Sequence, residues 1–163
     1  MKEGLFYRKI VRPLIALLKQ GITPKKMALS LAFGLVLGIF PVLGSTTILC
    51  ALAAIIFRLN LPVIQIVNYL IYPLQLLLVM PFIRAGEKIF RAQPIPFSLG
   101  DMVAMFRQNM AGTLAMLWTT TLHAIVAWLL VGPVLIYVLY RLLTPMMTRL
   151  GKVRVTGEAG EAA

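Results

Sequence analysis

Acidic residues, histidine and cysteine are scarce in this sequence: its 163 residues include 5 Asp and Glu together, 1 His and 1 Cys. Cys50 stands alone within an apolar run, so the chain contains neither an internal disulfide nor a site with several cysteine ligands. Three ionisable candidates for catalysis, Glu87, Asp101 and His123, fall on different predicted segments and form no carboxylate pair and no metal-binding spacing. We therefore expect no enzyme activity, no catalytic residue, no metal site and no cofactor.

Charged residues are also few, and apolar ones are abundant. Charged side chains make up 13% of the chain, against about 25% in typical soluble domains, while 60% of the residues are hydrophobic and the mean hydropathy is +0.91. These values predict an integral membrane protein. The net charge of +11 comes from basic residues beside apolar runs rather than from a stripe on a polar face. We expect the lipid bilayer and its anionic headgroups as partners, and no nucleic acid.

The first segment, residues 1–22, is basic and amphipathic. At helical spacing Ile10, Leu14 and Leu17 share one face, which favours a helix lying in the cytoplasmic interface. An ordinary helix packed on the rest of the protein is the alternative. The apolar run over residues 13–18 is shorter than the core of a signal peptide, so we expect no cleavage.

A single helical membrane domain is predicted over residues 23–140. Thr23 followed by Pro24 is typical of a helix start, with a hydroxyl cap and proline at the first helical position. Seven Lys or Arg residues precede Met27, against one acidic residue, and this bias places the N-terminus on the cytoplasmic side.

The first apolar block, residues 27–57, has a length that suits neither one crossing nor two. As one helix it would be about 46 Å long, whereas the hydrocarbon core of a bilayer is about 30 Å thick. The sequence FPVLG at its centre contains proline and glycine, which interrupt helices. We therefore predict a re-entrant broken-helix hairpin, with one tilted and kinked helix as the alternative.

The second block, residues 61–83, is long enough for one crossing of about 35 Å, kinked where Pro73 removes a backbone donor. A second hairpin around Tyr72 and Pro73 is the alternative. Amide side chains occur in this block, and in membranes such groups face protein or water and usually hold helices together. Asn68 and Gln75 are secondary candidates for ligand binding.

Two further helices are predicted. Residues 98–110 form an amphipathic helix at the interface, with Ser98 and Asp101 in the spacing of a capping box. Residues 111–140 form the last span, with a kink or a break at Gly132 and Pro133.

His123 lies well inside the last span, next to a run of threonines. Either its neutral imidazole bonds to another segment, or it has a proton or ligand role and is a third secondary candidate. Beyond this span, residues 141–163 are a basic to polar tail that we expect to be disordered at its end.

The predicted helix break suggests a binding site. If a second helical arm begins at Ser45, its first backbone N–H groups lack partners within the helix and point toward the middle of the membrane. Together with the positive end of the helix dipole, they favour a phosphate or carboxylate. The alternative is that nearby hydroxyls only cap the arm. The ligand-binding candidates are the hydroxyl residues Ser45, Thr46 and Thr47 and the turn residues Pro41 and Gly44.

An ordered series of glycines, prolines and one asparagine runs through residues 21–86: Pro24, Gly34, Gly38, Pro41, Gly44, Asn60, Pro62 and Pro73. With the strings TPKK, GLVLGIFPVLGSTT and RLNLP, it resembles the domain of unknown function 2062 (DUF2062) family of small bacterial membrane proteins. The resemblance implies a multi-pass protein of the bacterial cytoplasmic (inner) membrane. Some relatives resemble fusions with sugar-transferring enzymes, which implies a membrane glycan-synthesis enzyme as partner.

The predicted fold class is all-α, a polytopic helical membrane protein with a re-entrant hairpin, two crossings and both termini in the cytoplasm. Broken helices at membrane depth recur in transporters, so the first hypothesis is a non-enzymatic transporter or lipid- or anion-handling protein. The second is an accessory subunit that anchors or regulates a partner such as a lipid-linked glycosyltransferase, because one hairpin and two spans hardly enclose a pathway. The closely spaced Gly34 and Gly38 let helices approach within one chain or between chains, and we expect a homo-oligomer.

Overall fold

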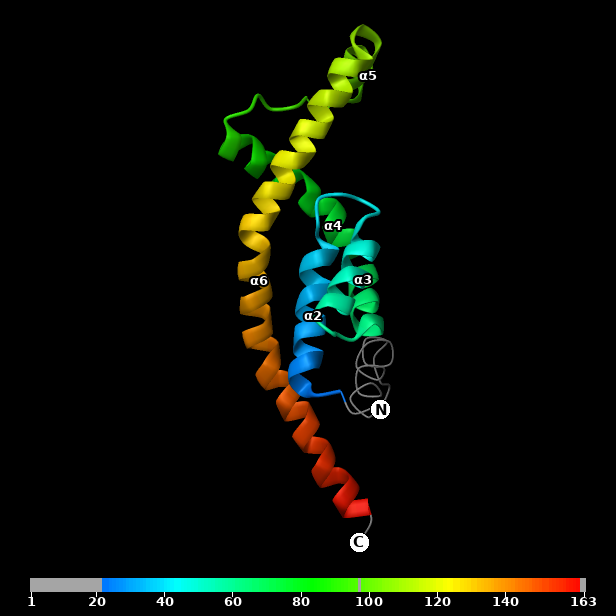
Figure 1. Cartoon of the computed structure of the whole chain (residues 1–163), viewed down its shortest axis with the longest axis vertical. Helices are drawn as coiled ribbons and strands as arrows, with labels where there is room; N and C mark the ends of the chain where they lie inside the picture. Colours follow the sequence, from blue (N-terminus) through cyan, green and yellow to red (C-terminus); the bar gives the residue numbers. More distant parts are fainter. Residues whose placement is uncertain (1–21, 97, 162–163) are drawn as a thin grey trace.

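The structure of this chain is a computed structural model that describes residues 22–96 and 98–161 (Figure 1). The amphipathic segment predicted over residues 1–22 therefore lies outside the described residues, apart from Ile22. The described residues form helices and no strand, which confirms the all-α class. The helices are α2 (Pro24–Gly38), α3 (Thr46–Ile56), α4 (Leu61–Phe90), α5 (Leu99–Gln108) and α6 (Met110–Glu161).

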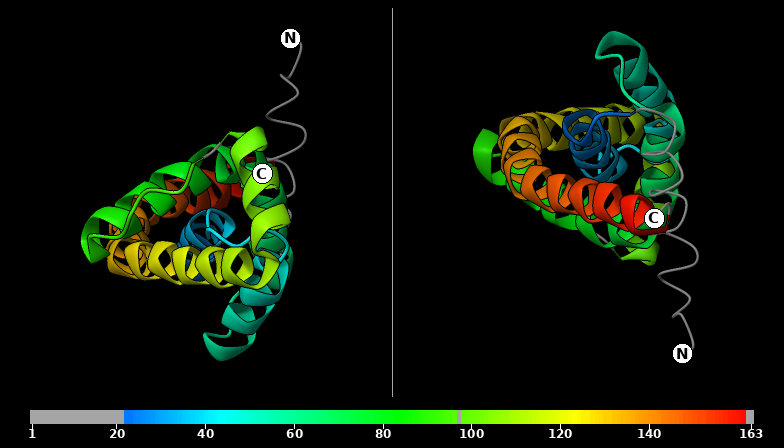
Figure 2. Two further views of the ribbon diagram at one scale, coloured as in Figure 1. Left: turned by 90° about the horizontal axis from the view of Figure 1, so that it is seen from above. Right: turned by 90° about the horizontal axis from the view of Figure 1, so that it is seen from below.

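The short helix α2 forms the centre of the molecule. It contacts α3, α4 and α6, and the end-on views show these helices around it (Figure 2). Beyond its first turn, which contains the exposed Lys25 and Lys26, it is mostly apolar around its circumference rather than amphipathic, as expected for a helix enclosed by its neighbours. One core cluster joins Val36 of α2 to Cys50, Ile64 and Trp128, and another joins Met27 to Met147.

The helix is interrupted between α2 and α3, and the chain reverses direction there (Figure 1). The interruption spans residues 39–45, called the tip below, and its Gly44 has φ +83°, a conformation that favours glycine. With lengths of about 22 Å and 16 Å at 1.5 Å per residue, α2 and α3 are each shorter than a hydrocarbon core. One kinked helix through residues 27–57 is thus not observed, and the location of the tip within a membrane stays a prediction.

Among residues 22–96 and 98–161, two helices are long and apolar enough to cross a membrane, α4 and the part of α6 over Met110–Arg149. Helix α4 continues through Pro73 and Pro81, so the alternative second hairpin is not observed. Helix α6 continues through Pro133, so the alternative of a break there is not observed either. A proline inside a helix removes one hydrogen bond but does not end the helix where the surrounding residues keep their own bonds.

The last helix also differs from the expected tail. It extends through the basic to polar tail to Glu161, whereas we expected the end of this tail to be disordered. Residues 146–161 contain no proline, and their glycines each cost a helix only about 1 kcal/mol.

Helix α5 lies at the far end of the molecule from the C-terminus and contacts α6 (Figure 1). It falls within the amphipathic helix predicted for residues 98–110. Ser98 is its N-cap residue, but the Ser98 side chain makes no cap hydrogen bond, so the predicted capping box is wrong in this respect. Because the start of α5 is exposed, its first N–H groups are accessible to water and need no side-chain cap.

Two glycines bring α2 against α4. A Cβ atom added to Gly34 would lie 2.9 Å from Val67 Cβ and 3.0 Å from the carbonyl oxygen of Ile64, and one added to Gly38 would overlap Ile71 Cγ2. The predicted small-residue face therefore packs within the chain. It is not available for the contact between chains that the sequence also allowed.

Candidate functional site

Short polar contacts fix the two ends of the α2–α3 hairpin next to the start of α4. Thr23 Oγ1 accepts a hydrogen bond from Lys26 N at 3.4 Å, which caps α2 as predicted. Ser30 Oγ accepts one from Asn60 N at 3.0 Å, and Asn60 Oδ1 accepts one from Val63 N at 3.0 Å, capping α4. Asn60 is therefore a structural residue that ties the end of the hairpin to the next helix.

The backbone carbonyls at the end of α2 are satisfied by side chains from distant helices. Gln75 Nε2 of α4 donates to the carbonyl of Phe40 at 2.8 Å, and Trp128 Nε1 of α6 donates to that of Val36 at 3.2 Å. The rings of Phe40 and Trp128 also meet edge to face, with centroids 5.0 Å apart. Since a helix end leaves carbonyls without partners, these contacts hold the tip in place. The secondary candidate Gln75 thus has a structural use, although its Oε1 atom is buried without a partner.

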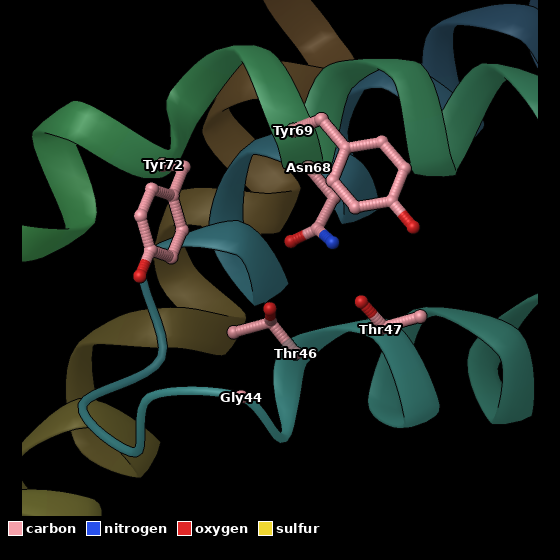
Figure 3. Close-up of a pocket in the computed structure, with 6 residues that line it drawn as sticks. All are labelled: Gly44, Thr46, Thr47, Asn68, Tyr69 and Tyr72. Atoms are coloured by element: carbon pink, nitrogen blue, oxygen red, sulfur yellow. The ribbon is translucent and has the colours of Figure 1, made fainter.

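A pocket of about 320 Å³ lies between the start of α3 and the middle of α4. Figure 3 shows the hydroxyls of Thr46 and Thr47 directed toward α4, and the side-chain amide of Asn68 directed toward α3. Gly44 lies at the end of the tip below them, and two tyrosines flank Asn68. The lining residues are Gly44, Thr46, Thr47, Asn68, Tyr69 and Tyr72.

The other predicted site residues lie elsewhere. Ser45 Oγ donates to the carbonyl of Val42 at 2.9 Å, so it is used within the turn, and Pro41 is buried in the tip. Neither residue is among those that line the pocket. No side chain caps the start of α3, so the alternative of capping hydroxyls is not observed.

Asn68 combines deep burial with an unsatisfied polar atom. Its side chain Nδ2 donates weakly to Gln65 Oε1 at 3.5 Å, and Gln65 Nε2 donates to the carbonyl of Thr47 at 3.0 Å. Asn68 is 3% exposed, and its Oδ1 atom has no hydrogen-bond partner. An unpaired buried acceptor costs about 1–3 kcal/mol, so a group that donates a hydrogen bond to it would be stabilising.

His123 is not part of this pocket. Its ring stacks on Phe90 at the end of α4, with centroids 4.1 Å apart and planes 11° from parallel. Its backbone meets Gly86, where an added Cβ would lie 2.5 Å from the His123 carbonyl carbon. Along α4, Gly86 is about 27 Å from Asn68 at 1.5 Å per residue. The Nδ1 atom of His123 has no partner, so the predicted hydrogen bond to another segment is replaced by ring stacking.

The threonines beside His123 have local roles. Thr119 Oγ1 donates to the carbonyl of Ala115 at 2.9 Å, and Thr121 Oγ1 to that of Leu117 at 2.8 Å. Such bonds to the preceding turn satisfy a hydroxyl within a helix. Across residues 22–96 and 98–161, no group of three or more His, Cys, Asp or Glu residues could hold a metal ion.

Sequence reasoning missed three residues around this site. Tyr69 and Tyr72 line the pocket. The sequence signal for Tyr72 is that residues 68 and 72 are one helical turn apart and so share a face. Trp128 is 6% exposed, its ring contacts Phe40 in the tip, and its Nε1 donates to the carbonyl of Val36. No local pattern identifies a contact between residues 92 positions apart.

Comparison with known protein families matches residues 8–155 to a family described as "uncharacterized protein conserved in bacteria (DUF2062)". No curated protein and no solved structure matches the chain.

Proposed function

This chain belongs to the DUF2062 family, and we propose that it is an integral membrane protein that binds an anionic lipid headgroup in the pocket between α3 and α4. The observation that carries the proposal is the buried Asn68, which lines this pocket at the uncapped start of α3 and whose Oδ1 has no partner.

Two features of the helices support the membrane location. In the most apolar 18-residue stretch of each helix, 17% of the residues of α4 and 22% of those of α6 are buried within the chain. The core helix of a soluble protein would be mostly buried, whereas a helix in a bilayer exposes apolar side chains to lipid. Ile55, Leu77 and Leu130, for example, are 73%, 71% and 62% exposed.

The position of the tip supports a re-entrant hairpin. Gln75, which binds the carbonyl of Phe40 in the tip, is in the middle of α4, about 21 Å from its start at Leu61. If the apolar part of α4 crosses the hydrocarbon core, the tip lies inside the core. The exposed backbone of such a turn is tolerated in a membrane only where protein or water surrounds it.

The chemistry of the pocket indicates the class of ligand. The first N–H groups of α3 have no partner within the helix and lie at the positive end of its dipole, so they favour an anion. The hydroxyls of Thr46 and Thr47 are directed toward α4 and can donate to a ligand, while Asn68 Oδ1 is an acceptor without a partner. A phosphate with one proton, or a phosphate beside a hydroxyl group as in a glycerol headgroup, offers both the acceptors and the donor.

The function that follows is the handling of an anionic lipid or a related anion without chemical conversion. Transport is the first form of this function, since broken helices with binding sites near the midplane occur in transporters. The pocket is lined by residues without charge, so a headgroup is held there by hydrogen bonds and the helix dipole rather than by a fixed cation. Without a fixed cation, the site binds a headgroup weakly enough for it to dissociate, as transport requires.

The test measures lipid binding by the reconstituted full chain and its double variant Thr46→Val plus Thr47→Val. Valine keeps the shape of threonine without the hydroxyl, so we expect binding of phosphatidylglycerol to weaken about tenfold or more. Thr119→Val, which removes a hydroxyl far from the pocket, is the matched control and should bind as the native chain does. Equal binding by folded native and double-variant protein would refute the site.

A second measurement addresses transport. Flux of a fluorescent anionic lipid across vesicles that contain the native chain should exceed flux across empty vesicles and across vesicles with the double variant. Binding without flux would contradict transport and favour a role as a lipid-binding subunit.

A further inference from the structure

Two arginines adopt a backbone conformation that favours glycine, and we propose that they bind the phosphate groups of anionic lipids at opposite faces of the membrane. Arg58 has φ +51° and Arg91 has φ +50°, and among the described residues they are the non-glycine residues with positive φ. A residue with a Cβ atom is disfavoured in this region. The inference rests on the membrane location of α4 in the proposed function, but not on the pocket at Asn68.

Both arginines end a helix in the same way. After α3 the N–H of Leu59 bonds to the carbonyl of Ala54 at 2.9 Å, and after α4 the N–H of Ala92 bonds to the carbonyl of Glu87 at 2.9 Å. This bond from the sixth residue to the first is typical of a helix end whose left-handed residue is glycine or asparagine. Either of those residues would form the turn more easily, so the turn does not explain the guanidinium group.

Each arginine lines a pocket that contains a second cation. The pocket at Arg58 has a volume of about 240 Å³, and the pocket at Arg91 has a volume of about 390 Å³. The first contains Lys26 beside Arg58, with the polar residues Thr23 and Asn60. The second contains Lys88 beside Arg91, with the pair Arg84 and Glu87.

The carboxylate of Glu87 is the one acidic group among the residues that line these pockets, and both of its oxygens already have partners. Glu87 Oε2 forms an ion pair with Arg84 at 2.8 Å, and Glu87 Oε1 accepts a hydrogen bond from the N–H of Ile95 at 2.9 Å. Within the described part of the chain, neither the pair Lys26 and Arg58 nor the pair Lys88 and Arg91 forms an ion pair. Each pocket thus has two cations for an external anion. Guanidinium binds phosphate through two parallel hydrogen bonds, and a lysine adds a compact positive charge.

The spacing of the two pockets fits a bilayer. Arg58 precedes α4, whose apolar part over residues 61–83 is about 35 Å long, and Arg91 follows the polar end of the same helix. The hydrocarbon core of a bilayer is about 30 Å thick, and its headgroup layers begin on either side. Both pockets therefore lie at headgroup level when α4 crosses the membrane, and anionic headgroups attract such cations.

The test uses the variants Arg58→Asn and Arg91→Asn, singly and together, in the full chain. Asparagine tolerates the left-handed conformation but has no charge, so the turns remain. Thermal unfolding is followed by tryptophan fluorescence in phosphatidylcholine vesicles with and without phosphatidylglycerol. Native protein should gain about 2–4 °C in Tm per arginine from the anionic lipid. The double variant should lose most of this gain, while its Tm in phosphatidylcholine alone stays equal or rises.

Three further arms decide the interpretation. Arg107→Gln neutralises an exposed arginine outside both pockets and should keep the gain in Tm. If this variant loses as much of the gain as the double asparagine variant, the gain depends only on net charge and the proposal is overturned. Inorganic phosphate added to phosphatidylcholine vesicles should not replace the anionic lipid, and full replacement would likewise overturn it. Arg58→Lys and Arg91→Lys should keep part of the gain, because the charge remains.

Failure of this inference is distinguishable from failure of the proposed function. Release of the chain from membranes by alkaline carbonate would refute the membrane location on which both rest. Retention in the membrane with the same lipid-dependent gain for the native chain and the double asparagine variant would refute the arginine sites alone.

Discussion

The side-chain amide of Gln75 donates a hydrogen bond to the main-chain carbonyl of Phe40, 2.8 Å away and 35 residues earlier in the chain. Gln75 is fully buried, and its partner lies in the tip where α2 has ended. This contact fixes the depth to which the α2–α3 hairpin extends along α4. It therefore positions the start of α3 opposite Asn68, and the pocket depends on it.

Replacement of Gln75 with leucine should destabilise the fold by about 1–3 kcal/mol, because the carbonyl of Phe40 loses its donor in a buried environment. The free energy of unfolding of the reconstituted protein measures the effect. Gln93→Leu, a change of the same kind at an exposed position, should alter stability by less than about 0.5 kcal/mol. Equal stability of both variants would show that the Gln75 contact does not hold the tip.

Substitution of Gly34 or Gly38 with alanine should destabilise the monomer, because the added Cβ meets Val67 and the Ile64 carbonyl in one case and Ile71 in the other. We expect a loss of about 1–3 kcal/mol for each. The control is Gly100→Ala in α5, where the nearest atom to an added Cβ is Ser98 Oγ at 3.6 Å, and it should be neutral or stabilising by up to about 1 kcal/mol. A variant at Gly34 that changes only the oligomeric state would contradict the contact within the chain.

Replacement of Asn68 with leucine should weaken binding of phosphatidylglycerol about tenfold while leaving the stability of the ligand-free protein equal or higher. The opposite signs arise because the substitution removes an acceptor that has no partner inside the protein. Binding and thermal unfolding are measured on the same preparation. Asn109→Ala should show the reverse, since Asn109 Oδ1 caps α6 through Gly112 N at 2.9 Å and lies outside the pocket. Its expected cost is about 1 kcal/mol of stability with unchanged binding.

The proposed topology can be tested by labelling single cysteines in a Cys50→Ala background. Cysteines at positions 58 and 149 should react from the cytoplasmic side, and a cysteine at position 93 should react from the opposite side, because α4 separates 58 from 93. If a cysteine at position 58 reacts only from the periplasmic side, the hairpin crosses the membrane and the re-entrant topology is wrong.

Local sequence patterns predicted the helix boundaries that depend on local chemistry. Thr23 and Pro24 mark the start of α2, and Pro41 and Gly44 lie in the interruption before α3. Each of these effects acts within a few residues of the amino acid that causes it, through fixed φ angles, a missing donor or a side-chain cap. The same reasoning allowed a kink or a break at Pro133, and only the break is excluded, because a proline also fits inside a long helix.

The parts of the site that the sequence did not predict depend on pairing between distant segments. Asn68 and Gln75 were recognised as polar residues within an apolar block. The bond of Gln75 to Phe40 and the position of Asn68 opposite the start of α3 follow only from the depth at which the hairpin meets α4. Ser45 was expected to face the ligand, yet its hydroxyl bonds within the turn to Val42. A sequence pattern contains the residue types of the site but not the rotation of α3 about its axis, which decides which hydroxyls face α4.

The enclosure of α2 has a consequence for synthesis of the protein. Met27 is fully buried against Met147, which emerges from the ribosome 120 residues later. At about 5–20 residues per second, α2 waits about 6–24 s for the helix that covers it. During this interval its apolar surface needs another cover, either lipid or the membrane insertion machinery. Assembly is therefore ordered by translation: α2, the first of the described helices to be made, reaches its final surroundings only when α6 arrives.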